Sequence, residues 1–286
     1  AIKFGSGRIR ELAEHCRACG IARPLLVTDK GLAAMPMVSA ILADLCNAGL
    51  AAELFAEVRP NPVEENVLAG CRAFTAGRHD GVVALGGGSG LDIGKLIALM
   101  HAQNLSVFEL EDIDDWWTRA NAAAIAPIIA VPTTAGTGSE VTQVAVVKDH
   151  EKHLKMAFTS YFLLPDIAVL DSRMTLTMPP FITAMTGMDA LSHATEAYYC
   201  LQKNPLSDAH ALSAVSMIYR NLPMVVQNPS DLNGRLAMSI GACLAGIAFS
   251  NSMTGIVHNL GHASGSVCGV PHGVAMAILL PYGLEY

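Results

Sequence analysis

The second half of this sequence spaces acidic and imidazole side chains as a metal site would. Asp189 and His193 stand four residues apart, His258 and His262 repeat that interval, and His272 follows. On a helix, residues four apart share one face, one turn from each other. Several imidazoles with one carboxylate suit Fe²⁺, Zn²⁺, Co²⁺ or Mn²⁺. Their neighbours are small or apolar, so the pattern favours a divalent metal site, with buried core histidines bonded to backbone carbonyls as the alternative.

A glycine-rich stretch, GGGSGLD at residues 86–92, offers a different chemistry. Consecutive glycines let backbone N–H groups approach an anion, and Ser89 adds a hydroxyl donor. A helix expected from Leu91 would point its positive end at the same place. The stretch is not the dinucleotide fingerprint, whose third glycine would fall on Leu91. It is not a Walker A loop, because Leu96 follows Lys95 in place of Ser or Thr. It predicts a phosphate site, with a tight strand-to-helix turn as the alternative.

Two further features belong with this loop. Residues 131–140, VPTTAGTGSE, also follow an apolar strand and offer hydroxyls and glycines. Asp29 ends the first strong strand. A carboxylate there can accept hydrogen bonds from both ribose hydroxyls of an adenosine and repels a 2′-phosphate, which favours NAD over NADP. Capping of the next helix explains Asp29 equally well.

The first half of the chain alternates short apolar runs with longer amphipathic stretches. The runs predict strands over residues 24–28, 51–55, 81–85 and 127–131, separated by helices over 38–48, 63–76 and 91–101. Continuous apolar strands alternating with helices are typical of a parallel sheet covered on both faces. Ligands of such sheets bind at the carboxyl ends of the strands, where both polar loops are expected.

The pattern changes near Pro179. Helices are predicted over residues 183–201, 207–224, 231–249 and 253–266, without a convincing strand. We therefore expect an α/β nucleotide-binding domain over residues 1–178 and an all-helical domain over 179–286. Because the chain stops at Tyr286 directly after an apolar run, we also expect C-terminal residues to be missing.

Composition narrows the classes of partner. The net charge is −7 and no basic patch is visible, which argues against nucleic acid. The mean hydropathy is high, +0.39, but the longest apolar stretches are interrupted and shorter than the roughly 20 residues of a membrane span. Seven cysteines, with Cys16 and Cys19 as ordinary thiols, favour a reducing, cytoplasmic location without disulfides. His150 and His153 are expected in a solvated hairpin.

Four stretches together resemble the iron-type (group III) alcohol dehydrogenases: GGGSGLDIGK, VPTTAGTGSEVT, GMDALSHATEAY and residues 258–273. The resemblance covers essentially the whole chain, in the family's order. It implies an N-terminal Rossmann-like parallel-sheet domain that binds the nucleotide. It also implies an all-helical metal-binding domain, in the architecture shared with dehydroquinate synthase, and an active site between the two.

The resemblance also implies roles for individual residues. It makes Asp189, His193, His258 and His272 the metal ligands and gives His262 a proton-relay role. It places Asp92 and Lys95 at polar positions of the glycine-loop helix. The cofactor contacts that it implies are Asp29, Asn61, Gly87, Gly88, Ser89, Asp92, Thr133, Thr134, Thr137 and Lys155.

The expected chemistry is oxidation of an alcohol. Its hydroxyl proton must leave before hydride can, and a divalent metal lowers the pKa of that hydroxyl. We expect an NAD-dependent enzyme that interconverts a small alcohol or diol and its aldehyde or ketone, with Fe²⁺ as the metal and Zn²⁺ acceptable to the same ligands. A homodimer or higher homo-oligomer is expected.

Three other functions stay open. A glycerol dehydrogenase or dehydroquinate synthase-like enzyme has a similar architecture, but only three protein ligands to zinc. A hydroxyacid–oxoacid transhydrogenase would shuttle hydride on trapped NAD. A non-catalytic NAD-binding scaffold would leave the metal ligands unexplained.

Overall fold

The computed structural model describes residues 1–149 and 154–286, so His150 and His153 lie outside the described residues. The chain forms two compact units. The first comprises residues 1–3, 7–132 and 143–169, and the second comprises residues 4–6, 133–142 and 170–286.

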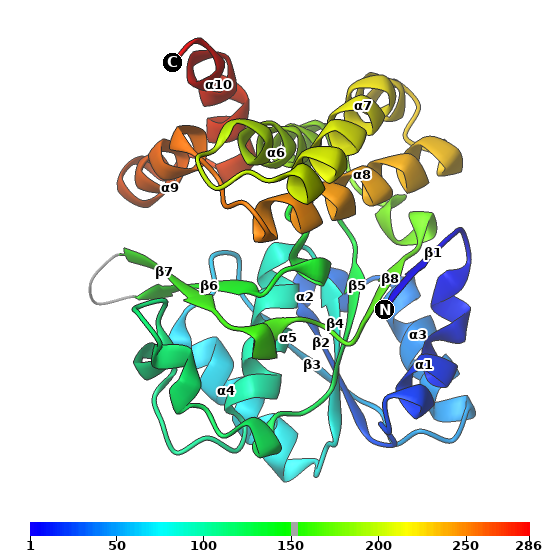
Figure 1. Cartoon of the computed structure of the whole chain (residues 1–286). Helices are drawn as coiled ribbons and strands as arrows, with labels where there is room; N and C mark the ends of the chain where they lie inside the picture. Colours follow the sequence, from blue (N-terminus) through cyan, green and yellow to red (C-terminus); the bar gives the residue numbers. More distant parts are fainter. Residues whose placement is uncertain (150–153) are drawn as a thin grey trace. The chain divides into compact units, whose positions relative to one another are not determined.

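The first unit is built on a six-stranded sheet in the order β1-β8-β5-β4-β2-β3 (Figure 1). Its strands are β1 (Ile2–Phe4), β2 (Pro24–Asp29), β3 (Glu53–Val58), β4 (Gly81–Gly86), β5 (Ile128–Pro132) and β8 (Ile167–Leu170). β2 pairs in parallel with β3 and β4, and β5 pairs in parallel with β4 and β8. β4 is buried along its whole length, as expected for an inner strand of a sheet covered on both faces. The predicted parallel α/β fold is confirmed.

Helices cover both faces of this sheet. They are α1 (Leu12–Ala18), α2 (Lys30–Ala33), α3 (Pro36–Asn47), α4 (Glu64–Ala76) and α5 (Gly88–Met100). In Figure 1, α1 and α3 lie to one side of the strands, and α4 and α5 lie to the other. Every residue of α5 from Ile93 onward is buried, so this helix is part of the core, which explains its almost uniformly apolar sequence.

A separate two-stranded antiparallel sheet packs against α5. It consists of β6 (Val144–Asp149) and β7 (Leu154–Thr159). Asp92 and Lys95 attach it to α5. The Asp92 carboxylate accepts a hydrogen bond from the Val146 backbone N–H at 3.1 Å, and the fully buried Lys95 ammonium donates to the Val144 carbonyl at 3.0 Å.

The second unit is helical, as predicted. Its helices are α6 (Pro180–Tyr199), α7 (Pro205–Gln227), α8 (Leu232–Ser250), α9 (Ile256–Cys268) and α10 (His272–Glu285). Helices α6, α7 and α8 pack together through small residues such as Ala190, Ala194 and Ala242, which allow close approach, and around larger ones such as Ile218. Helix α10, which was not predicted, packs against α6 and α9.

Helix α8 has a composition that would suit a membrane as well as a core. Among the described residues it is the one helix long and apolar enough to cross a bilayer, and 56% of its apolar window is buried inside the protein. Its packing against α6 and α7 explains that composition.

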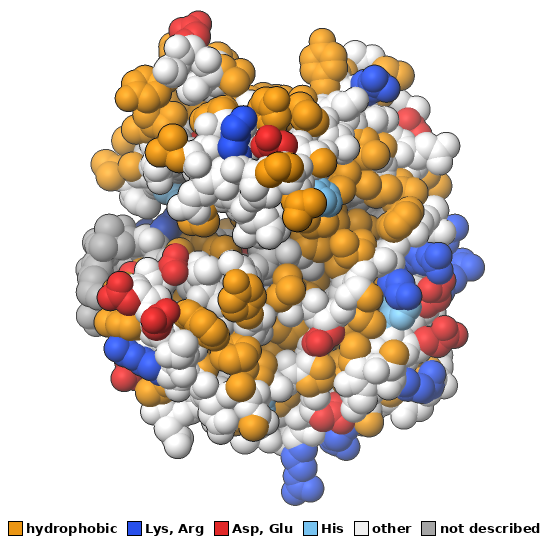
Figure 2. Space-filling model, in the orientation of Figure 1, with side chains coloured by type: hydrophobic (Ala, Val, Ile, Leu, Met, Phe, Trp, Pro, Cys, Tyr) orange, Lys and Arg blue, Asp and Glu red, His pale blue; other side chains and the backbone are white. Residues whose placement is uncertain are grey.

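On the face shown in Figure 2, Lys and Arg side chains are interspersed with Asp and Glu.

Candidate metal centre and cofactor loops

Helix α6 directs several ionisable side chains into the interior of the helical unit. Asp189, His193 and Glu196 follow at intervals of four and three residues, which places them on one face. They are 3%, 7% and 0% exposed. Burial of ionisable groups is costly unless they are paired or bind a cation, so this face needs compensating partners.

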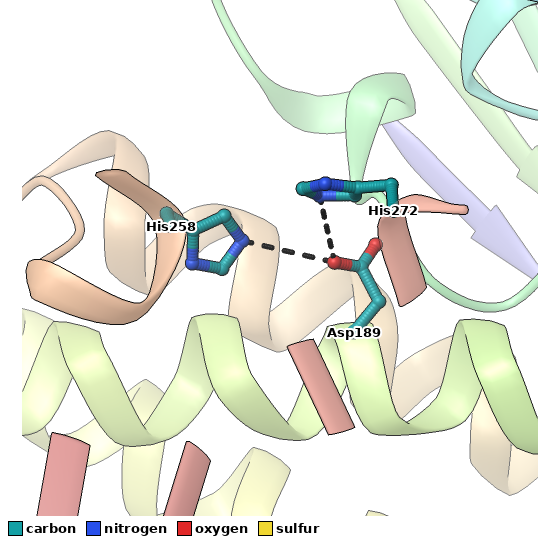
Figure 3. A group of neighbouring side chains, drawn as sticks. All are labelled: Asp189, His258 and His272. Carbon is teal, nitrogen blue, oxygen red and sulfur yellow. Dashed lines mark ion pairs between the residues drawn. The ribbon is translucent and has the colours of Figure 1, made fainter. Parts of the chain in front are cut away.

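Those partners come from the beginnings of two later helices. The Asp189 Oδ1 lies 3.7 Å from Nε2 of His258, near the start of α9, and 3.2 Å from Nε2 of His272, the first residue of α10 (Figure 3). One potential ligand atom from each of the three residues lies within 4.8 Å of the others. Three helices thus bring three potential ligands to one point.

The geometry and chemistry of this group fit a divalent cation. Two ligands about 2.1 Å from a tetrahedral metal stand about 3.4 Å apart, close to the distances observed here. The Asp189 Oδ1 and the His258 Nε2 are buried and have no hydrogen-bond partner among the described residues. A bound cation would satisfy both atoms.

His193 lies beside this group. Its ring stacks on Phe249 with a centroid distance of 4.5 Å and on His258 at 4.2 Å, and its Nδ1 is 3.9 Å from the Asp189 Oδ1. It is not one of the three residues whose ligand atoms lie within 4.8 Å of one another. Its place among the ligands therefore stays a prediction.

The ionisation of the cluster is shifted by burial and by mutual contact. Burial acts to raise the pKa of Asp189, but His193, His258 and His272 hold it well below its ordinary value. Burial, followed by the neighbouring His258, lowers the pKa of His193 to about 3. Burial lowers the pKa of His258, but its contacts with Asp189 and Glu196 outweigh that effect and raise it to about 9. The ionised Asp189 carboxylate favours a bound cation.

His262 borders the cluster. Its side chain is exposed, and its ring centroid lies 5.1 Å from that of His272 and 6.0 Å from that of His258. A group in this position can exchange protons with water, as its expected relay role requires.

Glu196 was not identified as a site residue from the sequence. It contacts the backbone at the start of α9 and the ring of His258. Its spacing was the available signal, because Glu196 stands seven residues after Asp189 and three after His193 inside the quoted motif. A glutamate at that spacing shares the helix face of the proposed ligands.

The glycine loop is the beginning of a helix. Helix α5 starts at Gly88 with Gly87 as its N-cap, three residues earlier than predicted. Gly88 and Ser89 therefore lie in the first helical turn, where backbone N–H groups lack partners within the helix. This position strengthens the case for an anion site. A Cβ at Gly90 would lie 3.2 Å from the Leu85 carbonyl oxygen, so glycine there lets α5 start close to β4.

The other expected cofactor residues of the first unit occupy varied positions. Asp29 caps α2, since its Oδ1 accepts a hydrogen bond from the Leu32 N–H at 3.0 Å. Its expected contact with ribose stays a prediction. Asn61 is exposed, with a left-handed φ of 50°, in the connection before α4. Lys155 lies on β7, and Asp92 faces β6 as described above.

Most of the expected second cofactor loop, residues 131–140, belongs to the helical unit, which includes residues 133–142. Gly138 has a left-handed φ of 63°, and a Cβ there would lie 2.7 Å from the Cα of Gly246 on α8. The pair of glycines fixes the loop against α8. Of the expected contacts, Thr133 is buried, whereas Thr134 and Thr137 are half-buried.

Comparison with known proteins gives matches along the chain. Residues 1–172 match the iron-containing alcohol dehydrogenase family, and residues 183–286 match the C-terminal part of the Fe-containing alcohol dehydrogenase family. The 1,3-propanediol dehydrogenase of Klebsiella pneumoniae is 39% identical over 285 residues, which are 99% of this chain and 72% of that protein.

Solved structures agree. A crystal structure of 1,3-propanediol oxidoreductase superimposes with a TM-score of 0.95 at 39% identity, covering 100% of this chain and 74% of the other. Sulfoacetaldehyde reductase from Bifidobacterium kashiwanohense, solved in complex with NAD⁺, gives a TM-score of 0.91 at 32% identity, with coverage of 100% and 74%.

Proposed function

The chain belongs to the iron-containing alcohol dehydrogenase family, and from that premise we propose that it uses Fe²⁺ and NAD to interconvert a small alcohol or diol and its carbonyl product. That it is an NAD(P)-dependent alcohol dehydrogenase follows from the family; the metal, the nucleotide and the substrate are proposals. The observation that carries the metal proposal is the convergence of Asp189, His258 and His272.

We propose Asp189, His193, His258 and His272 as the residues that hold the metal. Three imidazoles and one carboxylate accept either Fe²⁺ or Zn²⁺, and the family supports iron. When bound, the cation lowers the pKa of the alcohol hydroxyl and so prepares the carbon for hydride loss. The negative charge of the ionised Asp189 compensates the charge of the cation. The buried positions of His193 and His258 exclude water from the site of the cation.

Proton transfer falls to His262 in this proposal. The hydroxyl proton has to reach solvent during oxidation, and the exposed His262 ring borders the cluster. An imidazole ring can accept that proton on one nitrogen and pass it to water. In the reductive direction it returns a proton to the product oxygen.

NAD binding is proposed for the two loops. Gly87, Gly88 and Ser89 at the start of α5 would hold the pyrophosphate with backbone N–H groups and a hydroxyl. Thr133, Thr134 and Thr137 would contact the cofactor from the second loop, and Lys155 from β7. Asp29 would accept hydrogen bonds from the ribose, and Asn61 and Asp92 complete the proposed set.

The substrate proposal takes its support from a relative, a 1,3-propanediol dehydrogenase. The test is an NADH-coupled screen of C2 to C6 alcohols, diols and the matching aldehydes, after reconstitution with Fe²⁺ or Zn²⁺. Net NADH production from a primary alcohol or diol, strongest with Fe²⁺, is the expected result. Turnover that needs a second carbonyl compound and releases no NADH would identify a transhydrogenase instead.

Location and assembly are also proposals. The seven cysteines are all free, which supports a reducing, cytoplasmic compartment. A homodimer or higher homo-oligomer is proposed as well. Sedimentation of the purified protein tests it, and a monomer at micromolar concentration would contradict it.

A further inference from the structure

Glu196 is a fully buried carboxylate that joins two helices of the helical unit. It lies on α6, and its Oε1 accepts hydrogen bonds from the backbone N–H groups of Gly255 at 2.9 Å, Val257 at 2.8 Å and His258 at 3.3 Å. The Tyr199 hydroxyl approaches the same oxygen at 3.4 Å. The second oxygen, Oε2, pairs with Nδ1 of His258.

The first of these roles is that of a helix cap. The first N–H groups of any helix lack partners within it, and a side chain at the N-cap normally supplies one. The N-cap of α9 is Gly255, which has no side chain to do so. Glu196 supplies the acceptor from α6 instead, and its negative charge suits the positive end of α9.

The second role concerns the ring of His258. Metal binding displaces the proton from one nitrogen of the His258 ring, and the hydrogen bond made by the other nitrogen decides which of the two binds the metal. A carboxylate against Nδ1 keeps the proton there and leaves the lone pair on Nε2. That Nε2 is the atom 3.7 Å from the Asp189 Oδ1, in the group that fits a cation.

We propose that Glu196 is a positioning residue that fixes the start of α9 through Oε1 and the metal-binding orientation of His258 through Oε2. The inference rests on the proposed metal site. It assigns Glu196 no contact with substrate, and the two oxygens of one side chain divide the two tasks. The division makes the tasks separable by substitution.

The substitution Glu196→Gln separates the capping of α9 from the orientation of His258. The glutamine carbonyl oxygen can still accept from the backbone of α9, so the cap is kept. Its NH₂ group then faces Nδ1 of His258 and can only donate, which moves the ring proton to Nε2 and blocks the metal-binding nitrogen. Glu196→Ala removes both functions. Tyr199→Phe, which removes a weak contact to the capping oxygen, is the matched control.

The measurements are metal affinity, by competition with a chromophoric chelator, and thermal stability of the metal-free chain. We expect Glu196→Gln to weaken Zn²⁺ binding about 10- to 100-fold, while its metal-free melting temperature falls clearly less than that of Glu196→Ala, because the cap is kept and only the carboxylate charge is lost. Glu196→Ala should lose both metal affinity and thermal stability, and Tyr199→Phe should lose neither. Equal Zn²⁺ affinity in Glu196→Gln and the unaltered chain would overturn the inference.

A spectroscopic readout does not depend on any variant folding. In the Co²⁺-substituted protein, the Nδ1–H proton of His258 should give a shifted NMR signal that exchanges slowly with solvent, because Glu196 holds it in the interior. Rapid exchange of that proton would overturn the inference. An unaltered chain that takes up no divalent metal would instead overturn the proposed function.

Discussion

The Oδ1 of Asp189 and the Nε2 of His272 lie 3.2 Å apart, although one residue sits in the middle of α6 and the other begins α10. The contact requires α10 to start against α6, where Gly273 leaves the space. A Cβ on Gly273 would come within 2.4 Å of the Met185 carbonyl oxygen. The metal centre therefore depends on close helix packing as much as on its ligands.

The choice of nucleotide can be tested at Asp29. Asp29→Asn keeps an oxygen that can accept from the Leu32 N–H, so the cap of α2 persists, but it removes the charge that would repel a 2′-phosphate. We expect the ratio of kcat/KM for NADPH to that for NADH to rise about tenfold, equivalent to about 1.4 kcal/mol. The control is Asp44→Asn on the exposed side of α3. An unchanged ratio would leave Asp29 as a helix cap only.

The second cofactor loop can be tested without altering a proposed cofactor contact. A Cβ at Gly246 would lie 2.9 Å from the Gly138 carbonyl oxygen, a backbone atom that cannot rotate away. We expect Gly246→Ala to lower the free energy of unfolding by about 1–3 kcal/mol and to weaken NADH binding by displacing the loop. Denaturant unfolding and NADH fluorescence titration measure the two effects.

Gly241→Ala is the control for that substitution. It lies on the same helix, and its Cβ would come within 2.8 Å of the Ile218 side chain on α7 instead of a backbone atom of the loop. Gly241→Ala should also lower the stability, but it should leave NADH binding unchanged, because the nearest neighbours of its Cβ lie on α7. Identical behaviour of the two variants would show that the Gly138–Gly246 contact does not position the loop.

The proton relay makes a prediction that separates His262 from the ligands. His262→Ala should keep its metal and lose about 100-fold or more in kcat, because a relay group contributes to proton transfer and not to metal binding. Metal analysis and the pH profile of kcat test both parts. His210→Ala on α7 should change neither. Loss of the metal would make His262 a ligand, and unchanged kcat would remove its role.

The fold could be predicted because its signals are local. Runs such as residues 81–85 are continuously apolar and are followed by glycine, so they mark inner strands without knowledge of their partners. β1 and β8 were missed because three or four residues carry too little pattern. The start of α5 was placed too late because glycines at a helix N-terminus resemble a loop. Helix α10 was missed because its apolar run has no polar face to reveal a helical period.

The site was predictable only in part. The spacing of Asp189 and His193 marks one helix face, but spacing cannot show that His272 meets Asp189 while His193 stacks on Phe249. The spacing of Glu196 places it on the same helix face, but its role could not be predicted, because its partners are backbone groups and the His258 ring of another helix. These relationships arise from tertiary packing, which no local pattern encodes.

Stability at alkaline pH should depend on Cys16. Burial is the main cause that raises the pKa of this thiol from 9.0 to about 12. Above pH 9 the unfolded thiol ionises while the folded one keeps its proton, so stability falls as the pH rises toward 12. By pH 10 the loss is about 1.4 kcal/mol. Between pH 8 and 10, the free energy of unfolding in urea should fall by about 1.4 kcal/mol less in Cys16→Ala than in the unaltered chain. In the variant Cys46→Ala, which alters an exposed thiol, it should fall as much as in the unaltered chain. Equal losses in all three would contradict the assignment.

The metal content of His258→Ala tests the central claim most directly. The unaltered chain, reconstituted with Fe²⁺ or Zn²⁺ and freed of excess metal, is expected to hold one ion per chain. His258→Ala should hold almost none and lose activity, while its NADH binding stays nearly intact, because the glycine loop does not involve His258. Wild-type metal stoichiometry in His258→Ala would contradict the metal centre described here.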